Sequence, residues 1–166
     1  MKQGLVVADS GPAISLAVID QLELLDHLFG QVYIPAAVWE ELTKAPRGAH
    51  DQRIVHYFSD KVKAISGLND LAFMMGYGES EAVMLVREMH ADFLLIDDKK
   101  ARAIAAHIGI RCIGTIGILS FAKTAGIISQ LRPLFEALIH HKRYYALPML
   151  NAMLRHHGEG EMTLLP

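Results

Sequence analysis

The length, composition and charge of the chain exclude several classes of protein. It has 166 residues, of which 52% are hydrophobic and 20% are charged, so it can bury a core and is not a disordered chain. The net charge of −2 excludes a globally basic surface, and any site for a polyanion therefore has to be local. The longest mostly apolar stretch, residues 112–122, is too short to span a membrane.

The N-terminus and the single cysteine indicate a cytoplasmic protein. Met1 and Lys2 are followed at once by a strand-like run, and nothing there resembles a signal peptide. Cys112 cannot form a disulfide within the chain, so a reducing compartment is the natural setting.

Two short apolar runs end in carboxylates. Leu5–Ala8 is followed by Asp9, and Leu94–Ile96 is followed by Asp97 and Asp98. Each run is typical of a buried strand, and the carboxyl ends of parallel strands meet at one edge of a sheet, where open α/β sheets bind ligands. If both strands are parallel, these three acids lie together.

Strands alternate with helices along the chain. Predicted strands cover residues 5–8, 32–34, 62–65, 92–96 and 110–113, with 92–96 as the central strand; predicted helices cover 13–19, 22–29, 35–43, 54–58, 82–90, 99–107, 115–125, 128–141 and 147–157. Residues 66–78 fit neither pattern and are interpreted as a segment near a site. The alternation predicts an α/β fold whose central parallel sheet is covered on both faces.

The chain shows no internal repeat and no linker. We therefore predict a single domain over residues 1–158, with helices at about 128–157 packed on it, and a loose tail over residues 159–166.

Two further acids lie at helix positions that border apolar stripes. Glu41 follows the second strand on a helix, with Glu40 pointing further round, and Glu81 stands at the start of the helix after residue 78. Carboxylates gathered within a few ångströms raise one another's pKa unless a cation neutralises them. Oxygen ligands suit Mg²⁺ or Mn²⁺, which can activate water against a phosphodiester. The pattern therefore indicates metal-dependent phosphodiester hydrolysis.

Each acid also has a structural alternative. Asp98 can cap the helix that begins at Lys99, and Asp9 can cap the turn into the first helix. Glu79 and Glu81 can complement a helix dipole, and the acid after the second strand can be an ordinary surface residue. The joint arrangement of the acids, rather than any single one, favours a site.

Other acidic α/β proteins fit the sequence less well. A phosphatase of the haloacid dehalogenase type needs a second aspartate two residues after Asp9, where Gly11 stands. A response-regulator receiver carries its acid pair after the first strand, whereas here the pair follows a later one. The sequence contains no P-loop and no G-x-G-x-x-G motif.

An ordered set of segments resembles the PIN-domain-like proteins, in particular an uncharacterised bacterial and archaeal branch that is similar to the PIN ribonucleases of toxin–antitoxin pairs. The segments are Val7–Pro12, Tyr33–Leu42, Gly78–Ala82, Leu94–Arg102, Gly109-Ile110 and Gly114–Leu119. They cover roughly residues 4 to 140.

The resemblance implies a three-layer α/β/α sandwich with an acidic pocket for Mg²⁺ or Mn²⁺. It implies cleavage of single-stranded RNA as the usual activity. Many relatives are toxins inhibited by a small antitoxin protein, and many are homodimers, so both partners are expected here.

The resemblance also implies which residues act. The family's acids are matched, in order, by Asp9, Glu41, Glu81 and Asp98, with Glu40 as the other candidate for the helix acid and Asp97 beside the last as a further metal ligand. Ser10 stands at a position that often carries a hydroxyl and is expected to contact the nucleic acid. Two of these positions carry glutamate where many toxins have aspartate, which lengthens the reach to a metal.

Basic residues follow the acid pair. Lys99, Lys100 and Arg102 lie just past the predicted pocket and can hold phosphates, or they can form a solvated helix face. The sequence therefore leaves two hypotheses. One is a metal-dependent PIN-type ribonuclease of the toxin kind, and the other is a non-catalytic PIN-like module that binds nucleic acid or protein.

Overall fold

The computed structural model describes residues 2–44 and 50–163. The chain divides into two compact units, residues 1–115 and 116–166, and each is described by itself. The prediction of a single domain over residues 1–158 stays a prediction.

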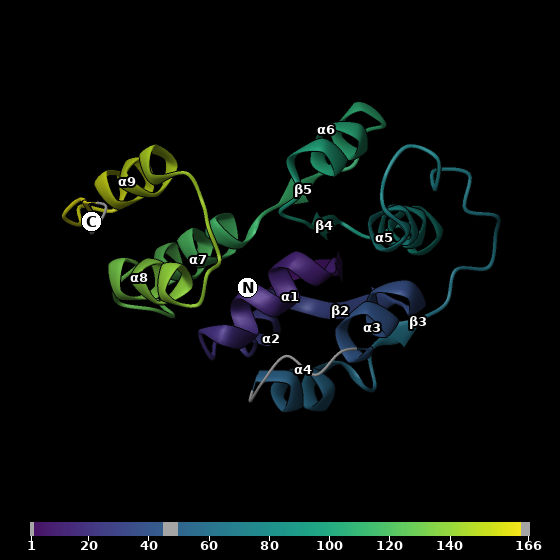
Figure 1. Cartoon of the computed structure of the whole chain (residues 1–166), viewed down its shortest axis with the longest axis horizontal. Coiled ribbons are helices and arrows are strands. Elements are labelled where there is room, and N and C mark those ends of the chain that lie inside the picture. Colours follow the sequence, from purple (N-terminus) through teal and green to yellow (C-terminus); the bar gives the residue numbers. More distant parts are fainter. Residues whose placement is uncertain (1, 45–49, 164–166) are drawn as a thin grey trace. The chain divides into compact units, whose positions relative to one another are not determined.

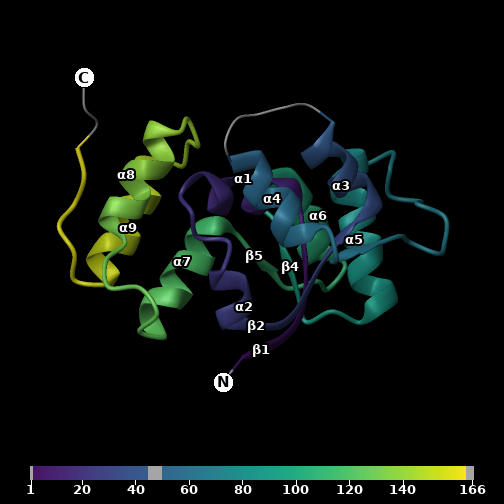
Figure 2. The ribbon, with the colours of Figure 1, turned by 90° about the horizontal axis from the view of Figure 1, so that it is seen from below.

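A five-stranded parallel sheet forms the centre of the first unit (Figure 1). Its strands are β1 (Gln3–Ala8), β2 (Phe29–Pro35), β3 (Val62–Lys63), β4 (Phe93–Leu95) and β5 (Cys112–Ile113), in the order β3-β2-β1-β4-β5. Figure 2 shows β1 and β2 running side by side. The central strand is β1, so the prediction of residues 92–96 as the central strand is wrong. Strands added after β1 extend the sheet first on one side and then on the other.

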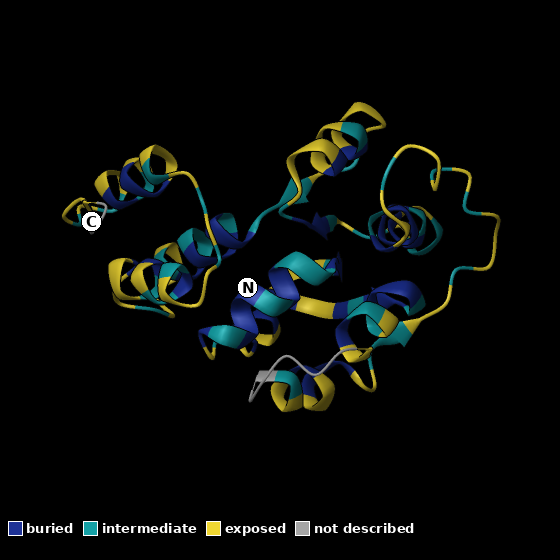
Figure 3. Ribbon diagram, viewed as in Figure 1, coloured by how far each residue is buried: buried dark blue, intermediate teal, exposed yellow. Residues whose placement is uncertain are grey.

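Helices cover both faces of this sheet. They are α1 (Ser10–Val18), α2 (Leu24–Leu28), α3 (Ala36–Thr43), α4 (His50–Phe58), α5 (Tyr77–Met89) and α6 (Lys99–His107). On one face, α5 and α6 pack against Val7, Leu94 and Ile96. Val6 and Ala8 alternate with Val7 and are also fully buried, so the other face is covered as well (Figure 3). The predicted three-layer α/β/α fold is confirmed.

The predicted helix over residues 22–29 is too long. Helix α2 ends at Leu28, and Phe29 already belongs to β2. Gly30 lies inside the strand, where a Cβ would lie 3.2 Å from the carbonyl oxygen of Gly4. Gly30 therefore permits close pairing of β2 with β1.

The second unit is helical. It contains most of α7 (Thr115–Thr124), then α8 (Arg132–His140) and α9 (Leu147–His156). Among the residues that the structure describes, no helix is long and apolar enough to cross a membrane.

The segment after α9 is tied down where the sequence predicted a loose tail. The Glu159 carboxylate accepts hydrogen bonds from the N–H groups of Leu131 and Arg132, and the Asn151 side chain bonds both the N–H and the carbonyl of Met162. Residues 159–163 therefore differ from the prediction, and residues 164–166 lie outside the described residues.

Candidate active site

The side on which the chain adds strands to the sheet reverses between β1 and β4. From β1 the chain extends the sheet through β2 and β3, and it later returns to the other side of β1 to add β4 and β5. Ala8 pairs with Leu95, and the Asp9 N–H donates to the Leu95 carbonyl at 2.9 Å. Asp9 and Asp97 therefore leave the sheet at the switch point, where open α/β sheets bind ligands.

Asp9 is buried and does not cap a helix. Its exposed fraction is 4%, and its Oδ1 atom is buried without a hydrogen-bond partner. It stands at the N-cap position of α1, yet its side chain makes no capping bond. The third helical residue is Pro12, which has no N–H to donate. Asp9 therefore makes no bond to a third helical N–H as a capping aspartate would, and its buried Oδ1 requires an explanation such as a bound water or ion.

Burial and nearby acids raise the pKa of Asp9 from 3.8 to about 7. Burial is the largest cause, and the negative charges of Glu79 and Glu41 add to it. The backbone N–H groups of Ser10 and Gly11 offset part of the rise. Glu79 and Glu41 thus act on Asp9, Glu79 the more strongly, and the predicted set of metal ligands stays a prediction.

Glu41 lies against a glycine of α5. A Cβ placed on Gly78 would lie 2.3 Å from Glu41 Oε1, so the side chain occupies space that only glycine leaves open. Glu40, the other candidate, is exposed. Helices α3 and α5 pack together here, and this contact carries Glu41 toward Asp9.

Glu79 and Glu81 play different parts on α5. Glu79, in the first turn, folds over Gly76, where a Cβ would lie 1.9 Å from its Oε2. Glu81 is 7% exposed, and its Oε2 accepts the N–H of Ala37 at 2.9 Å. Ala37 is the second residue of α3, so Glu81 satisfies a backbone donor at the start of a neighbouring helix.

The two acids after β4 have different hydrogen-bond partners and different exposure. Asp98 caps α6, because its Oδ1 accepts the Ala101 N–H at 2.7 Å, and it is exposed. Asp97 is half-buried, and its two oxygens accept the N–H and the hydroxyl of Thr115, each at 2.7 Å. A Cβ placed on Gly11 would lie 3.4 Å from the Cβ of Asp97. Asp97, and not Asp98, therefore borders the start of α1.

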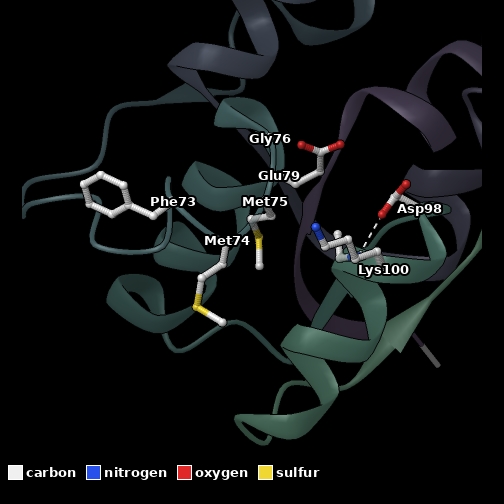
Figure 4. Close-up of a pocket in the computed structure, with 8 residues that line it drawn as sticks. Phe73, Met74, Met75, Gly76, Glu79, Asp98 and Lys100 are labelled. Carbon is white, nitrogen blue, oxygen red and sulfur yellow. Dashed lines mark hydrogen bonds between the residues drawn. The ribbon is translucent and has the colours of Figure 1, made fainter.

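The basic residues at the start of α6 lie beside different parts of the site. Lys99, Lys100 and Arg102 are all exposed. Lys100 lines a hollow of about 330 Å³ together with Glu79 and Asp98 (Figure 4). Arg102 turns toward Gly114, where a Cβ would lie 3.3 Å from its Nη1 and 3.0 Å from Asp97 Oδ1. The structure thus brings Lys100 to the hollow and Arg102 to the neighbourhood of Asp97.

A family model described as a PIN domain matches residues 5–159. The chain belongs to the PIN-domain family. The predicted resemblance is confirmed, and with it a nuclease-type fold. No curated protein is similar enough to the chain to count as a match.

The acids of this PIN domain fit a hard divalent cation in their chemistry. Carboxylate oxygens are the ligands that Mg²⁺ and Mn²⁺ prefer, and Asp9 Oδ1 is a buried oxygen without a hydrogen-bond partner. Within residues 2–44 and 50–163, however, no three His, Cys, Asp or Glu side chains are placed to hold one ion together. The donor chemistry therefore fits such an ion, whereas the positions of the described side chains form no ready-made site for it.

Sequence reasoning missed the residues that hold the acids in place. Thr115 binds both oxygens of Asp97, and Gly78 makes room for Glu41. A signal for Gly78 was present, because two glycines flank Tyr77 directly before a predicted helix. Thr115 lies within the family-like segment Gly114–Leu119, but no local pattern pointed to Asp97, its partner eighteen residues earlier.

Proposed function

We propose that this PIN-domain protein is a divalent-metal-dependent ribonuclease that hydrolyses phosphodiester bonds of single-stranded RNA. The observation that carries the proposal is the environment of Asp9. Its carboxyl group is buried at the switch point of the sheet, lacks a hydrogen-bond partner at Oδ1, and has a pKa raised to about 7 beside Glu41 and Glu79. Burying such a carboxyl group without a partner destabilises the fold, and a bound cation would offset that destabilisation.

Asp9, Glu41 and Glu79 would hold Mg²⁺ or Mn²⁺ as the principal ligands. When bound, the metal supplies an activated water and neutralises charge on the phosphodiester. Asp97 stands next to this group in an orientation fixed by Thr115. Glu81 and Asp98 each use one oxygen to hold the start of α3 or α6, so they position the helices that carry the other groups.

We also propose partners, on the strength of the family resemblance. Many PIN-type ribonucleases are toxins restrained by a small antitoxin protein, and many act as homodimers. The cheapest observation is a small antitoxin-like gene adjacent to the gene for this protein. Light scattering of the purified chain measures whether it forms a dimer.

The decisive experiment is cleavage of a mixed single-stranded RNA pool. We would incubate purified protein with Mg²⁺, Mn²⁺ or chelator, beside the variants Asp9→Asn and Glu40→Gln. We expect metal-dependent cleavage that falls at least about 100-fold in Asp9→Asn, because removing a principal ligand weakens the metal site. Glu40→Gln is the matched control, since Glu40 is exposed and faces away. Cleavage that survives Asp9→Asn would contradict the proposal.

A second candidate function is a non-catalytic PIN module that binds nucleic acid or protein. One observation favours this second function. The carboxylate oxygens of Glu81, Asp97 and Asp98 all accept hydrogen bonds from the protein itself. Calorimetry separates the two functions. Divalent binding to folded protein without cleavage of any RNA supports the module.

A further inference from the structure

The segment between β3 and α5 displays apolar side chains to solvent. We call residues 66–76 the Phe73 loop. Phe73 is 96% exposed, Leu68 is 90% exposed and Met74 is 52% exposed. Three large apolar side chains are therefore exposed within seven residues, and exposed apolar groups that gather in one place mark binding surfaces. No function has yet been assigned to them.

The Phe73 loop is nevertheless held in place by its own contacts. The Glu88 carboxylate accepts hydrogen bonds from the N–H groups of Ser66 and Gly67, and the Asn69 amide donates to Ser80 Oγ at 2.7 Å. These bonds join the first half of the loop to α5. The exposure of Leu68 and Phe73 is therefore set by an anchored backbone.

The second half of the loop is anchored by apolar packing. Leu71 and Met75 are partly buried against the core cluster beneath α5, and the Met74 N–H closes a turn on the Leu71 carbonyl at 2.9 Å. Phe73 lies between these anchors and points outward. A fixed turn that presents an aromatic ring loses little conformational freedom when a ligand binds the ring.

This turn forms one side of the hollow beside the candidate active site. Phe73, Met74 and Met75 line the hollow together with Lys100 and Glu79. Figure 4 shows the Phe73 ring pointing away from the other labelled side chains, with Met74 and Met75 between it and Lys100, whose ammonium group is turned toward Met75 and Glu79. Glu79 in turn acts electrostatically on Asp9. The hollow thus leads from an exposed aromatic ring, past two methionines, to a cation and then to the acids.

We propose that the Phe73 loop is a platform for one base of single-stranded RNA, with the Phe73 ring stacked on the base and Lys100 paired with a backbone phosphate. This inference rests on the proposed function and names how that site holds its substrate. An exposed aromatic ring and a cation that line one hollow can together bind a nucleotide, since each base offers a π-face and each phosphate a negative charge. A stacked base carries no sequence preference of its own, so the platform positions the strand without selecting a sequence.

The test is equilibrium binding of a fluorescently labelled oligouridine RNA, followed by anisotropy in chelator at low salt. Without metal there is no metal-dependent cleavage, so the readout does not depend on catalysis. We expect Phe73→Ala to weaken binding about 5- to 150-fold, the range for removing a base–aromatic stack. Phe73→Trp should bind at least as tightly as the wild type, because the ring is kept and enlarged.

Two further variants separate stacking from charge and from general apolarity. Leu68→Ala removes an equally exposed apolar side chain of the same loop that does not line the hollow, and we expect its affinity to stay within about twofold. Lys100→Gln should weaken binding and lower the slope of log affinity against log salt by about 0.7. Because Phe73 and Lys100 are exposed, the variants should keep the wild-type melting temperature.

Unchanged RNA binding in Phe73→Ala, or a wild type that binds no RNA, would overturn the platform. In that case the apolar patch would serve a protein partner instead. The two proposals also fail separately. Phe73-dependent binding with no cleavage under any metal would remove the ribonuclease and leave the platform, whereas cleavage that is insensitive to Phe73→Ala would do the reverse.

Discussion

The segments after β1 and after β4 begin alike and end in different structures. Each is a buried apolar strand that runs into an aspartate and then directly into a helix. Asp98 caps α6 through the N–H of Ala101, and Asp9 makes no capping bond to α1. The difference follows from the residue three positions later, because Pro12 has no N–H where Ala101 has one. The proline therefore explains why Asp98 makes a side-chain cap and Asp9 does not.

Solvent exposure widens the difference. Asp98 is exposed, so water satisfies the oxygen that the cap leaves free, whereas Asp9 is 4% exposed beneath two other acids. Asp97 is intermediate, since Thr115 occupies both of its oxygens. The comparison teaches that a strand-to-acid motif marks where a site can be, and that neighbouring donors decide which acid is available.

The largest effect is expected on the pH dependence of stability. The pKa of Asp9 is raised from 3.8 to about 7 in the folded protein, chiefly by burial. Between these values the folded state binds more protons than the unfolded state, so the free energy of unfolding falls as pH rises. By pH 7 to 8 the loss is on the order of 4 kcal/mol. Urea denaturation of the wild type and Asp9→Asn, in chelator from pH 4 to 8, measures it.

The variant carries no titrating group at this position, so its stability should fall less over the same pH range. Glu40→Gln provides the control, and its curve should run parallel to that of the wild type because Glu40 is exposed. Parallel curves for Asp9→Asn and the wild type would show that Asp9 titrates normally. The contrast between a buried Asp9 without a capping bond and an exposed, capping Asp98 would then have no effect on stability.

A smaller effect on the free energy of unfolding is expected when the hydrogen bond from the Thr115 hydroxyl to Asp97 is removed. Thr115→Val keeps the shape of the side chain but removes the hydroxyl that donates to Asp97 Oδ2. Because a hydrogen bond to a charged group is lost in a half-buried place, we expect destabilisation of about 1–2 kcal/mol. Thr124→Val is the matched control on the same helix, since the Thr124 hydroxyl donates only to a backbone carbonyl and is exposed. Equal losses in both variants would show that Asp97 gains nothing from Thr115.

The smallest effect is expected at Asp98. Asp98→Ala removes the cap of α6 and should cost about 1 kcal/mol, while Asp98→Asn, which caps equally well, should stay within about 0.5 kcal/mol. Cleavage assays on the same variants sharpen the comparison. Asp98→Asn should retain metal-dependent cleavage if Asp98 acts as a cap alone, and a loss as large as that of Asp9→Asn would make the two acids equivalent.

The sequence alone determined the parallel α/β fold, the strand ends that carry Asp9, Asp97 and Asp98, and the exact bounds of α6. These features follow from local patterns, since apolar runs bury themselves and Lys99–His107 has a capping residue before it and a glycine after it. The sequence left the helix acid open between Glu41, which borders the apolar stripe of its helix, and Glu40, which points further round.

Only the tertiary structure decided which acids are available. Glu81 is engaged by Ala37 and Asp97 by Thr115, and both partners come from elements distant in the sequence. The central place of β1 and the outward position of Phe73 were likewise set by strand order and by anchors on α5. Local patterns fix where a backbone turns, whereas the hydrogen-bond partners of a buried carboxylate depend on which distant donors the packed chain brings within about 3 Å.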